Sequence, residues 1–242
     1  MNVTIARHGK CAALSALCLA AMLCVSSATE VARAATIASW TFETSAPATA
    51  GPFSPEVGSG SALGSHAGST VYSAPAGNSS VHSFSSTAWS VGDYYQFKVS
   101  TTGFAQVQLS WDQASSNTGP RDFVLQYSTN GTTFTPFGSP FAVLTNGAPN
   151  TPWTSVSGTP NPAYTITENL SSLTALTNAA TVYFRITDNS TVSANGGAVG
   201  SGGTDRVDNF TVTATGVPEP GSIVLAVMGA SGLFMAFRRR GR

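Results

Sequence analysis

The stretch QVQLSW, Gln106–Trp111, decides the fold class because polar and apolar residues alternate along it. A period of two places Val107, Leu109 and Trp111 on one face of a β-strand and leaves the side chains between them for water. A strand of this kind has one buried and one wet face. It therefore predicts a sheet that packs on a core with one side only.

The same alternation recurs along the chain, at Tyr95–Val99, Phe123–Tyr127 and Val182–Ile186. Asn130-Gly131 is the strongest hairpin signal, since this pair suits the tight turn between two antiparallel strands, here Arg121–Ser128 and Thr132–Phe137. Further strands are predicted at Thr36–Phe42, Val71–Ser73, Phe141–Leu144, Trp153–Ser157, Tyr164–Thr167 and Asn209–Thr215.

Many short strands separated by Gly, Ser, Asn and Pro predict an all-β, antiparallel β-sandwich that is jelly-roll-like. Two Gly- and Ser-rich stretches, Ser45–Gly68 and Thr191–Thr204, are predicted to be extended surface loops. All three cysteines lie among the first 34 residues, so the sandwich has no disulfide and depends on its hydrophobic core.

Residues 1–34 have the pattern of a secretory signal peptide. Arg7, His8 and Lys10 precede an apolar stretch, residues 11–25, and Ala32-Arg33-Ala34 offers a cleavage site. The rival interpretation is a first transmembrane helix, but the apolar stretch is short and rich in small residues. We therefore expect residues 35–216 to form an exported domain.

The last segment, residues 217–242, contains an uncharged apolar run at residues 221–237. A helix of that length reaches about 25 Å, the low end of what crosses a bilayer. Four arginines follow the run, at positions 238, 239, 240 and 242, and such a cluster favours the cytoplasmic side. The pattern predicts a single C-terminal transmembrane helix, with the preceding domain outside.

The net charge of zero for the whole chain hides an acidic exported domain. Residues 35–216 contain 4 basic and 9 acidic side chains, a balance of about −5. A nucleic-acid-binding domain needs a basic patch, so the composition argues against nucleic acid as a partner.

The C-terminal segment begins with Val217-Pro218-Glu219-Pro220, followed by the apolar run and the arginines. This order resembles the PEP-CTERM sorting signal of Gram-negative bacteria. The resemblance implies an inner-membrane-anchored precursor that an exosortase processes near Pro218, Glu219 and Pro220, and then delivery to the cell surface or an exopolysaccharide matrix. The two prolines keep the motif extended and accessible to a processing enzyme. The alternative is an ordinary linker before a permanent anchor.

Three carboxylates are candidates for a structural calcium site: Glu43, Asp205 and Asp208. Carbohydrate-binding jelly rolls often hold calcium between an acid after the first strand and an Asp near the last. Asp208 shares the phase of Phe210 and Val212, so it is expected to point toward the core, where a carboxylate needs a partner. The alternative is that Asp208 pairs with an arginine or caps a turn.

Aromatic residues are the candidates for glycan binding. Tyr94 and Tyr183 fall in the polar phase of their strands, and Trp89 and Trp153 lie at strand or loop edges. Each of the four could instead pack across strands. Trp40 and Trp111 fall in the apolar phase and are expected in the core.

These observations predict a non-catalytic surface or matrix protein that is associated with exopolysaccharide or biofilm and binds glycan. A glycan-active hydrolase is the first alternative, with a carboxylate pair drawn from Asp112, Asp122, Asp205 and Asp208. The second is a purely structural matrix protein without a ligand. No G-x-S-x-G motif occurs, and His66 and His82 lie in Ser- and Gly-rich surroundings.

Overall fold

A computed structural model of the chain describes residues 33–155, 158–217 and 229. The described residues form thirteen strands and two short 3-10 helices, η1 and η2. The strands are β1 (Ala34–Trp40), β2 (Val57–Gly58), β3 (Gly60–Ser65), β4 (Tyr72–Ser73), β5 (Phe84–Ser86), β6 (Tyr94–Val99), β7 (Phe104–Ser115), β8 (Asp122–Ser128), β9 (Thr135–Ala142), β10 (Leu144–Thr145), β11 (Thr165–Asn169), β12 (Val182–Asp188) and β13 (Asp205–Gly216); η1 spans Pro162–Tyr164 and η2 spans Thr174–Leu176.

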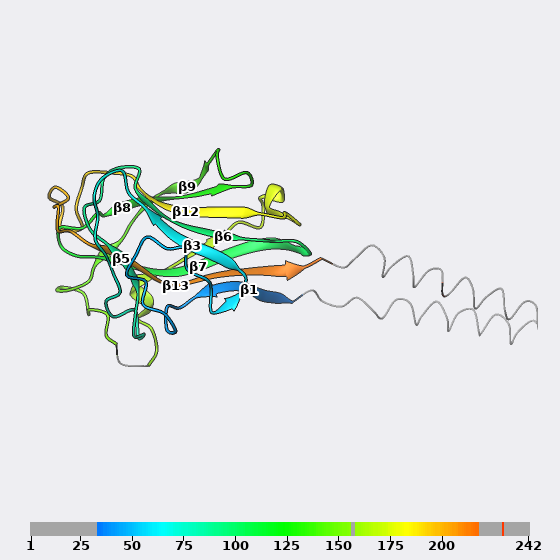
Figure 1. The fold of residues 1–242 in the computed structure, drawn as a ribbon, viewed down its shortest axis with the longest axis horizontal. Coiled ribbons are helices and arrows are strands. Elements are labelled where there is room, and N and C mark those ends of the chain that lie inside the picture. Colours follow the sequence, from blue (N-terminus) through cyan, green and yellow to red (C-terminus); the bar gives the residue numbers. More distant parts are fainter. Residues whose placement is uncertain (1–32, 156–157, 218–228, 230–242) are drawn as a thin grey trace, which may run out of the picture. The chain divides into compact units, whose positions relative to one another are not determined.

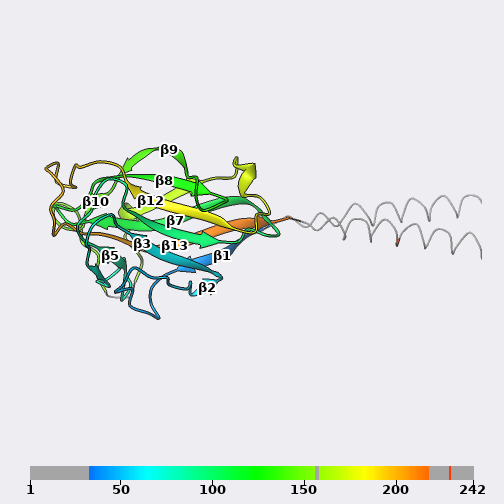
Figure 2. The ribbon, with the colours of Figure 1, turned by 45° about the horizontal axis from the view of Figure 1, so that its top comes forward.

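The strands form two sheets, which confirms the all-β prediction (Figures 1 and 2). Five strands make one sheet in the order β3-β6-β12-β8-β9, with every pair antiparallel. The other sheet has eight strands, with the path β10-β7-β13-β1-β2 and with β11, β5 and β4 attached to it. Its only parallel pair among the described residues is β10 with β7.

The core between the sheets is rich in aromatic residues. The rings of Phe97, from the five-stranded sheet, and Phe210, from the eight-stranded sheet, stack with centroids 3.6 Å apart. Trp40 packs edge-on against both rings, and Trp111 is equally buried. Both tryptophans thus lie in the core as predicted. Burial of such rings is the main stabilisation available to a domain without disulfides.

Residues 34–217 form one compact unit, and all thirteen strands lie within it. Its two ends lie side by side, because Ala34 on β1 pairs with Thr215 on β13. Figure 1 shows these two strands together, β1 in blue and β13 in orange. A segment that contains its own core and closes its own sheet is expected to fold without the rest of the chain.

The prediction that Ser45–Gly68 is a loop was wrong, because this stretch contains β3, an edge strand of the five-stranded sheet. Gly60 has no room for a side chain, since a Cβ there would lie 2.3 Å from the carbonyl oxygen of Lys98 and 3.0 Å from the Trp40 ring. The ring of Tyr72 occupies the corresponding space at Gly64. Close neighbours thus require glycine at positions 60 and 64 of β3, which removes the apolar alternation that would reveal a strand.

The predicted phase of Asp208 was also wrong. Asn209 has a left-handed backbone, with φ 52°, and the pairing of β13 with β7 shifts register between Asp208 and Thr211. This bulge adds one residue to β13, so Asp208 faces away from the core that Phe210 enters. The predicted strand Trp153–Ser157 is likewise not formed at residues 153–155, and residues 156–157 lie outside the described residues.

The predicted signal peptide (residues 1–34) and the predicted transmembrane run (221–237) fall almost entirely outside the described residues, as does the Pro218-Glu219-Pro220 motif. Within the part of the chain that the structure describes, no helix is long and apolar enough to cross a membrane.

Candidate functional site

Tyr94 and Tyr183 lie on the outer face of the five-stranded sheet, and both are half-buried. Their strand neighbours Tyr95 and Phe184 point into the core. The alternation read from the sequence therefore placed both tyrosines on the correct side. Neither tyrosine hydroxyl has a hydrogen-bond partner among the described residues, so both can bond to a ligand.

The strand register sets the neighbours of the two tyrosines on this face. Lys98 pairs with Tyr183, and Gln96 pairs with Arg185 one row further along β6 and β12. Gln126 of β8 lies on the other side of Arg185 in the same row. The face thus presents amide, hydroxyl, ammonium and guanidinium groups around the tyrosine rings. We call these six residues and Phe134 the tyrosine face.

Arg185 is the centre of the tyrosine face. Its guanidinium carbon lies 3.8 Å from the centroid of the Tyr94 ring and 3.4 Å from that of the Phe134 ring, so one ring covers each side of the planar cation. Its Nε donates to Oε1 of Gln96 at 2.9 Å. Burial lowers the pKa of Arg185 from its ordinary value, but a guanidinium remains protonated in proteins.

Phe134 reaches this position from the loop between β8 and β9, which is the predicted hairpin connection. The loop spans residues 129–134, so it is longer than the two-residue turn that Asn130-Gly131 predicts. The side-chain oxygen of Asn130 accepts hydrogen bonds from the backbone of Thr132 and Thr133, both at 2.9 Å. This turn folds the loop back over Tyr183.

The loop approaches Tyr183 so closely that position 131 must be glycine. Gly131 has φ 73°, and a Cβ there would lie 2.8 Å from Cζ of Tyr183. Sequence reasoning missed Arg185 and Phe134 as site residues. The polar phase of Arg185 in β12 was a usable signal, whereas nothing local indicates where Phe134 lies, since that depends on how the loop folds.

Trp89 does not belong to a surface site, because its side chain is buried. Its Nε1 donates to the carbonyl of Ser86 at 3.0 Å, and its ring packs against His66 and Phe123. The sequence placed it at a loop edge, but the loop that carries it closes over the core. Trp89 therefore offers no ring face to a glycan.

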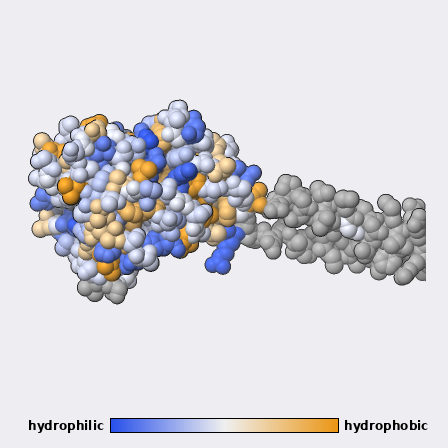
Figure 3. Space-filling view, in the orientation of Figure 1, coloured by the Kyte–Doolittle hydropathy of each residue, from blue (hydrophilic) through white to orange (hydrophobic). Residues whose placement is uncertain are grey.

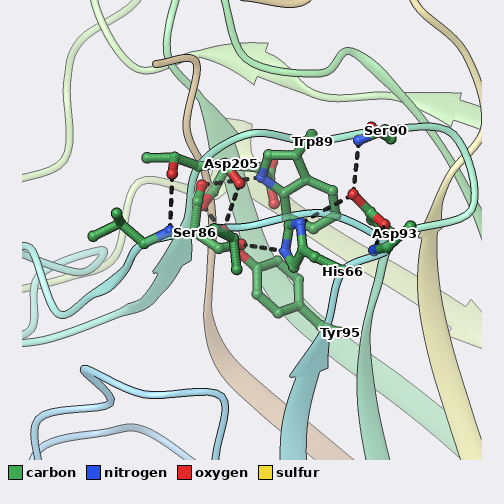
Figure 4. Close-up of polar contacts among 11 residues, drawn as sticks. His66, Ser86, Trp89, Ser90, Asp93, Tyr95 and Asp205 are labelled. Atoms are coloured by element: carbon green, nitrogen blue, oxygen red, sulfur yellow. Dashed lines mark hydrogen bonds and ion pairs between the residues drawn. The ribbon is translucent and has the colours of Figure 1, made fainter. Parts of the chain in front are cut away.

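Beside Trp89 lies a buried polar chain that runs through His66 (Figure 4). Nε2 of His66 lies 3.0 Å from Oγ of Ser86, and Nδ1 lies 3.0 Å from Oδ2 of Asp93 in an alignment too poor for a hydrogen bond. Ser86 then contacts Tyr95, whose hydroxyl donates to the carbonyl of Asp205 at 2.8 Å. Burial lowers the pKa of His66, which favours the neutral imidazole.

The order Ser86–His66–Asp93 is that of a nucleophile, a base and an orienting acid. Ser86 is fully buried, and Oγ already contacts both His66 and Tyr95. Asp93 accepts backbone hydrogen bonds from Ala67 and Ser90, both at 2.7 Å. These buried polar contacts therefore link β3, β5 and β6 below the surface. They leave no room for a substrate beside Ser86.

Trp153 is also buried, against Tyr164 and beneath Arg206, in a small cluster on the outer side of the eight-stranded sheet. The sequence placed it at a strand edge. The long segment that carries it folds back onto β7 instead, so this tryptophan too has no exposed ring for stacking.

The three calcium candidates do not converge. Asp205 and Asp208 project from opposite faces of β13, and the oxygens of Asp205 accept from Gln113 and Ser115. Glu43 accepts from the backbone N–H of Val81 at 3.2 Å. Protein donors thus supply what a cation would supply to Asp205. No cluster of three metal-ligating side chains occurs among residues 33–155 and 158–217.

The four carboxylates that could supply a catalytic pair for a glycan hydrolase do not form an exposed pair. They are Asp112, Asp122, Asp205 and Asp208. Asp112 and Asp208 are cross-strand partners, joined by the side-chain amide of Asn209 at 2.9 Å and 3.3 Å. Both are buried, and Oδ2 of Asp208 also accepts from Ser80. Asp122 is paired with Arg121 at 2.8 Å.

A second surface feature is a half-open groove of about 230 Å³ on the outer face of the eight-stranded sheet. Polar side chains of β7, β11 and β13 form most of its lining: Gln108, Ser110, Thr167, Glu168, Asn169, Thr211 and Thr213. The groove has no aromatic ring, unlike the tyrosine face. In the view of Figure 3, hydrophobic residues lie scattered among polar ones and form no continuous apolar patch.

No protein-family model and no curated protein matches the chain. Among solved structures, the K1 cleaved adhesin domain of Lys-gingipain from Porphyromonas gingivalis W83 is 13% identical, with a TM-score of 0.43, and the match covers 76% of this chain and 99% of that one. The carbohydrate-binding module TmCBM61, solved with β-1,4-galactotriose, is 9% identical, with a TM-score of 0.36 and coverage of 71% and 92%.

Proposed function

We propose that the chain is an exported, non-catalytic protein of the bacterial surface or extracellular matrix, and that it binds polysaccharide through the tyrosine face. The observation that carries this proposal is the set of half-buried rings of Tyr94, Tyr183 and Phe134 on one outer sheet face. Rings beside amide and hydroxyl groups suit sugars, because a sugar has apolar C–H faces and a rim of hydroxyls.

The export part of the proposal rests on the two ends of the chain. The signal-peptide pattern of residues 1–34 and the Pro218-Glu219-Pro220 tail would deliver residues 35–216 to the outside, with exosortase as processing partner and residues 221–237 as the temporary membrane anchor. Replacement of the three motif residues by alanine should leave an uncut, membrane-bound product in the producing bacterium. Unchanged release of the domain would contradict sorting.

The binding part is tested with recombinant residues 34–217 on a panel of bacterial and plant polysaccharides. Tyr94→Ala and Tyr183→Ala should abolish saturable binding while leaving the thermal midpoint close to that of the unaltered domain. Gln108→Ala and Thr213→Ala are matched controls, because they alter the groove on the other sheet. Binding lost only in the control variants would move the site to that groove, and binding to no polysaccharide would favour a purely structural matrix protein.

A further inference from the structure

The guanidinium of Arg185 has donors that the domain does not use. Tyr94 and Phe134 cover its two faces, and Gln96 takes the Nε–H. No described residue accepts a hydrogen bond from Nη1 or Nη2. The group can therefore reach a ligand only in its own plane, through the N–H groups of these two nitrogens. That edge matches the two oxygens of a carboxylate.

The charge around Arg185 also favours an anion. Lys98 lies one strand away, so two of the four basic residues of the exported domain lie on this face. At the outward-facing positions of β3, β6, β8 and β12 the one carboxylate is Asp122, which Arg121 already neutralises through two hydrogen bonds of 2.8 and 3.0 Å. A domain with a balance of about −5 thus has a locally positive face.

The stacking holds the cation in a fixed position rather than leaving it to move in water. Both rings and Gln96 restrict the side chain before any ligand arrives, so binding costs less conformational entropy than it would for a free arginine. Partial burial also strengthens an ion pair relative to one in open solvent. A single salt bridge on an ordinary exposed arginine would contribute little.

We propose that the tyrosine face selects acidic polysaccharide, that is, chains with uronic acid carboxylates, and that Arg185 pairs with one carboxylate while Lys98 attracts another. This inference rests on the proposed glycan-binding function and names the ligand class. The hydroxyls of Tyr94 and Tyr183 and the amide of Gln126 lie on the same sheet face, where they would meet sugar hydroxyls. Two cations are too few for the phosphate-tracking surface of a nucleic-acid-binding protein.

The test compares polygalacturonate with its fully methyl-esterified form, which has the same backbone without the charge. Isothermal titration calorimetry of recombinant residues 34–217 should show binding of the acid form that is roughly ten- to hundredfold tighter than that of the ester. Arg185→Gln should remove most of this difference and leave the smaller part that Lys98 contributes. Arg185→Lys should also remove most of the difference, because lysine keeps the charge but lacks the planar fork.

The double variant Arg121→Gln/Asp122→Asn is the control, since it removes an arginine outside the tyrosine face together with the carboxylate that this arginine neutralises, and it should leave both affinities unchanged. Lys98→Gln provides a second variant if the Arg185 variants fail to fold, because Lys98 is exposed and makes only a 5.7 Å contact with the Tyr183 ring. It should weaken binding of the acid form and leave that of the ester as it was.

Three outcomes would overturn the inference, and they separate it from the proposed function. Equal, Tyr183-dependent binding of the acid and the ester would leave glycan binding intact and reject acid selection. Binding of polygalacturonate and dextran sulfate that Arg185→Lys does not alter would show general attraction to polyanions. Absence of binding to every polysaccharide would reject both the inference and the function on which it rests.

Discussion

The side chain of Asp208 is buried, and burial disfavours the charged form of its carboxylate. Burial raises its pKa to about 7, and the neighbouring Asp112 contributes in the same direction, although hydrogen bonds from Ser80, Asn78 and Asn209 act against this rise. The folded protein therefore binds a proton at Asp208 more tightly than the unfolded chain does, where the pKa is 3.8. The stabilisation from this proton is complete below about pH 4 and is lost as the pH rises through about 7.

We expect Asp208→Asn to remove this pH dependence. The free energy of unfolding of the unaltered domain, minus that of the variant, should fall by up to about 4 kcal/mol between pH 4 and pH 8. Urea unfolding of the unaltered domain and of the variant at a series of pH values measures both free energies of unfolding. Asparagine presents an N–H₂ group to neighbours that are themselves donors, so the variant should be less stable at low pH. A difference that stays constant with pH would contradict the pKa shift of Asp208.

At the scale of an element, the loop between β8 and β9 packs Gly131 against Tyr183 of the tyrosine face. Gly131→Ala adds a Cβ that lies 2.8 Å from the Tyr183 ring, whereas Gly138→Ala, with φ 69°, adds one with nothing within 4 Å. Both variants should lose about 1–2 kcal/mol of stability, because both place alanine at a left-handed φ. Only Gly131→Ala displaces Tyr183, so only this variant should weaken polysaccharide binding.

Denaturant unfolding and calorimetry of the two variants separate the backbone cost from the contact with Tyr183. If Gly138→Ala weakened binding as much as Gly131→Ala, the effect would be general strain in the hairpin. The position of Tyr183 beneath the loop would then have no special role in the ligand site.

The bulge at Asn209 leads to a second prediction, which concerns strand β13. The side-chain amide of Asn209 donates to Asp112 and Asp208, and its backbone has φ 52°. Asn209→Gly keeps the backbone conformation and loses the amide, so it should cost about 1–3 kcal/mol. Asn209→Ala should cost about 1 kcal/mol more, because alanine also strains the backbone. Urea unfolding compares the two, and equal costs would mean that φ is not a constraint at this position.

The same elements show what alternation along the sequence can predict. It identified β6, β7, β8 and β12, and it placed Tyr94 and Tyr183 on the outer face, because period-two patterning reports directly which side of a strand is buried. It missed β3, where Trp40 and Tyr72 leave no room for a side chain at Gly60 and Gly64. It misplaced Asp208, because one left-handed residue reverses the phase of a strand and leaves no mark in the hydrophobic pattern.

The site was less predictable than the sheets. Phase alone made Tyr94 and Tyr183 candidates, but the position of Arg185 between two rings depends on a six-residue loop that brings Phe134 over the sheet. The prediction that Trp89 and Trp153 are exposed was wrong for a related reason. Both lie on irregular segments, where no period exists to show that the segment folds inward over the core.

For the whole domain, the arrangement of ends and faces bears on the proposed attachment to the cell surface. Ala34 and Gly216 both belong to the eight-stranded sheet, at its β1 and β13 strands. The five-stranded sheet receives no chain connection from outside the domain, so a tail at either end is joined to the opposite layer. This arrangement suits a protein that is attached through its ends and binds through the other sheet.

Stability of the whole domain should not depend on calcium. Protein donors occupy the oxygens of Asp205 and Asp208, and these two residues face opposite sides of β13. Glu43 accepts hydrogen bonds from the backbone N–H of Val81, and none joins it to Asp205 or Asp208 among the described residues. We therefore expect the thermal midpoint of residues 34–217 to be the same with a chelator and with added calcium. Differential scanning calorimetry without polysaccharide measures it, since acidic glycans bind calcium themselves. The opposite result would be a thermal midpoint that rises with calcium, and rises less in Glu43→Gln. It would establish a bound cation that joins the first strand to the last. The stability of the domain would then depend on the ion as well as on the aromatic core.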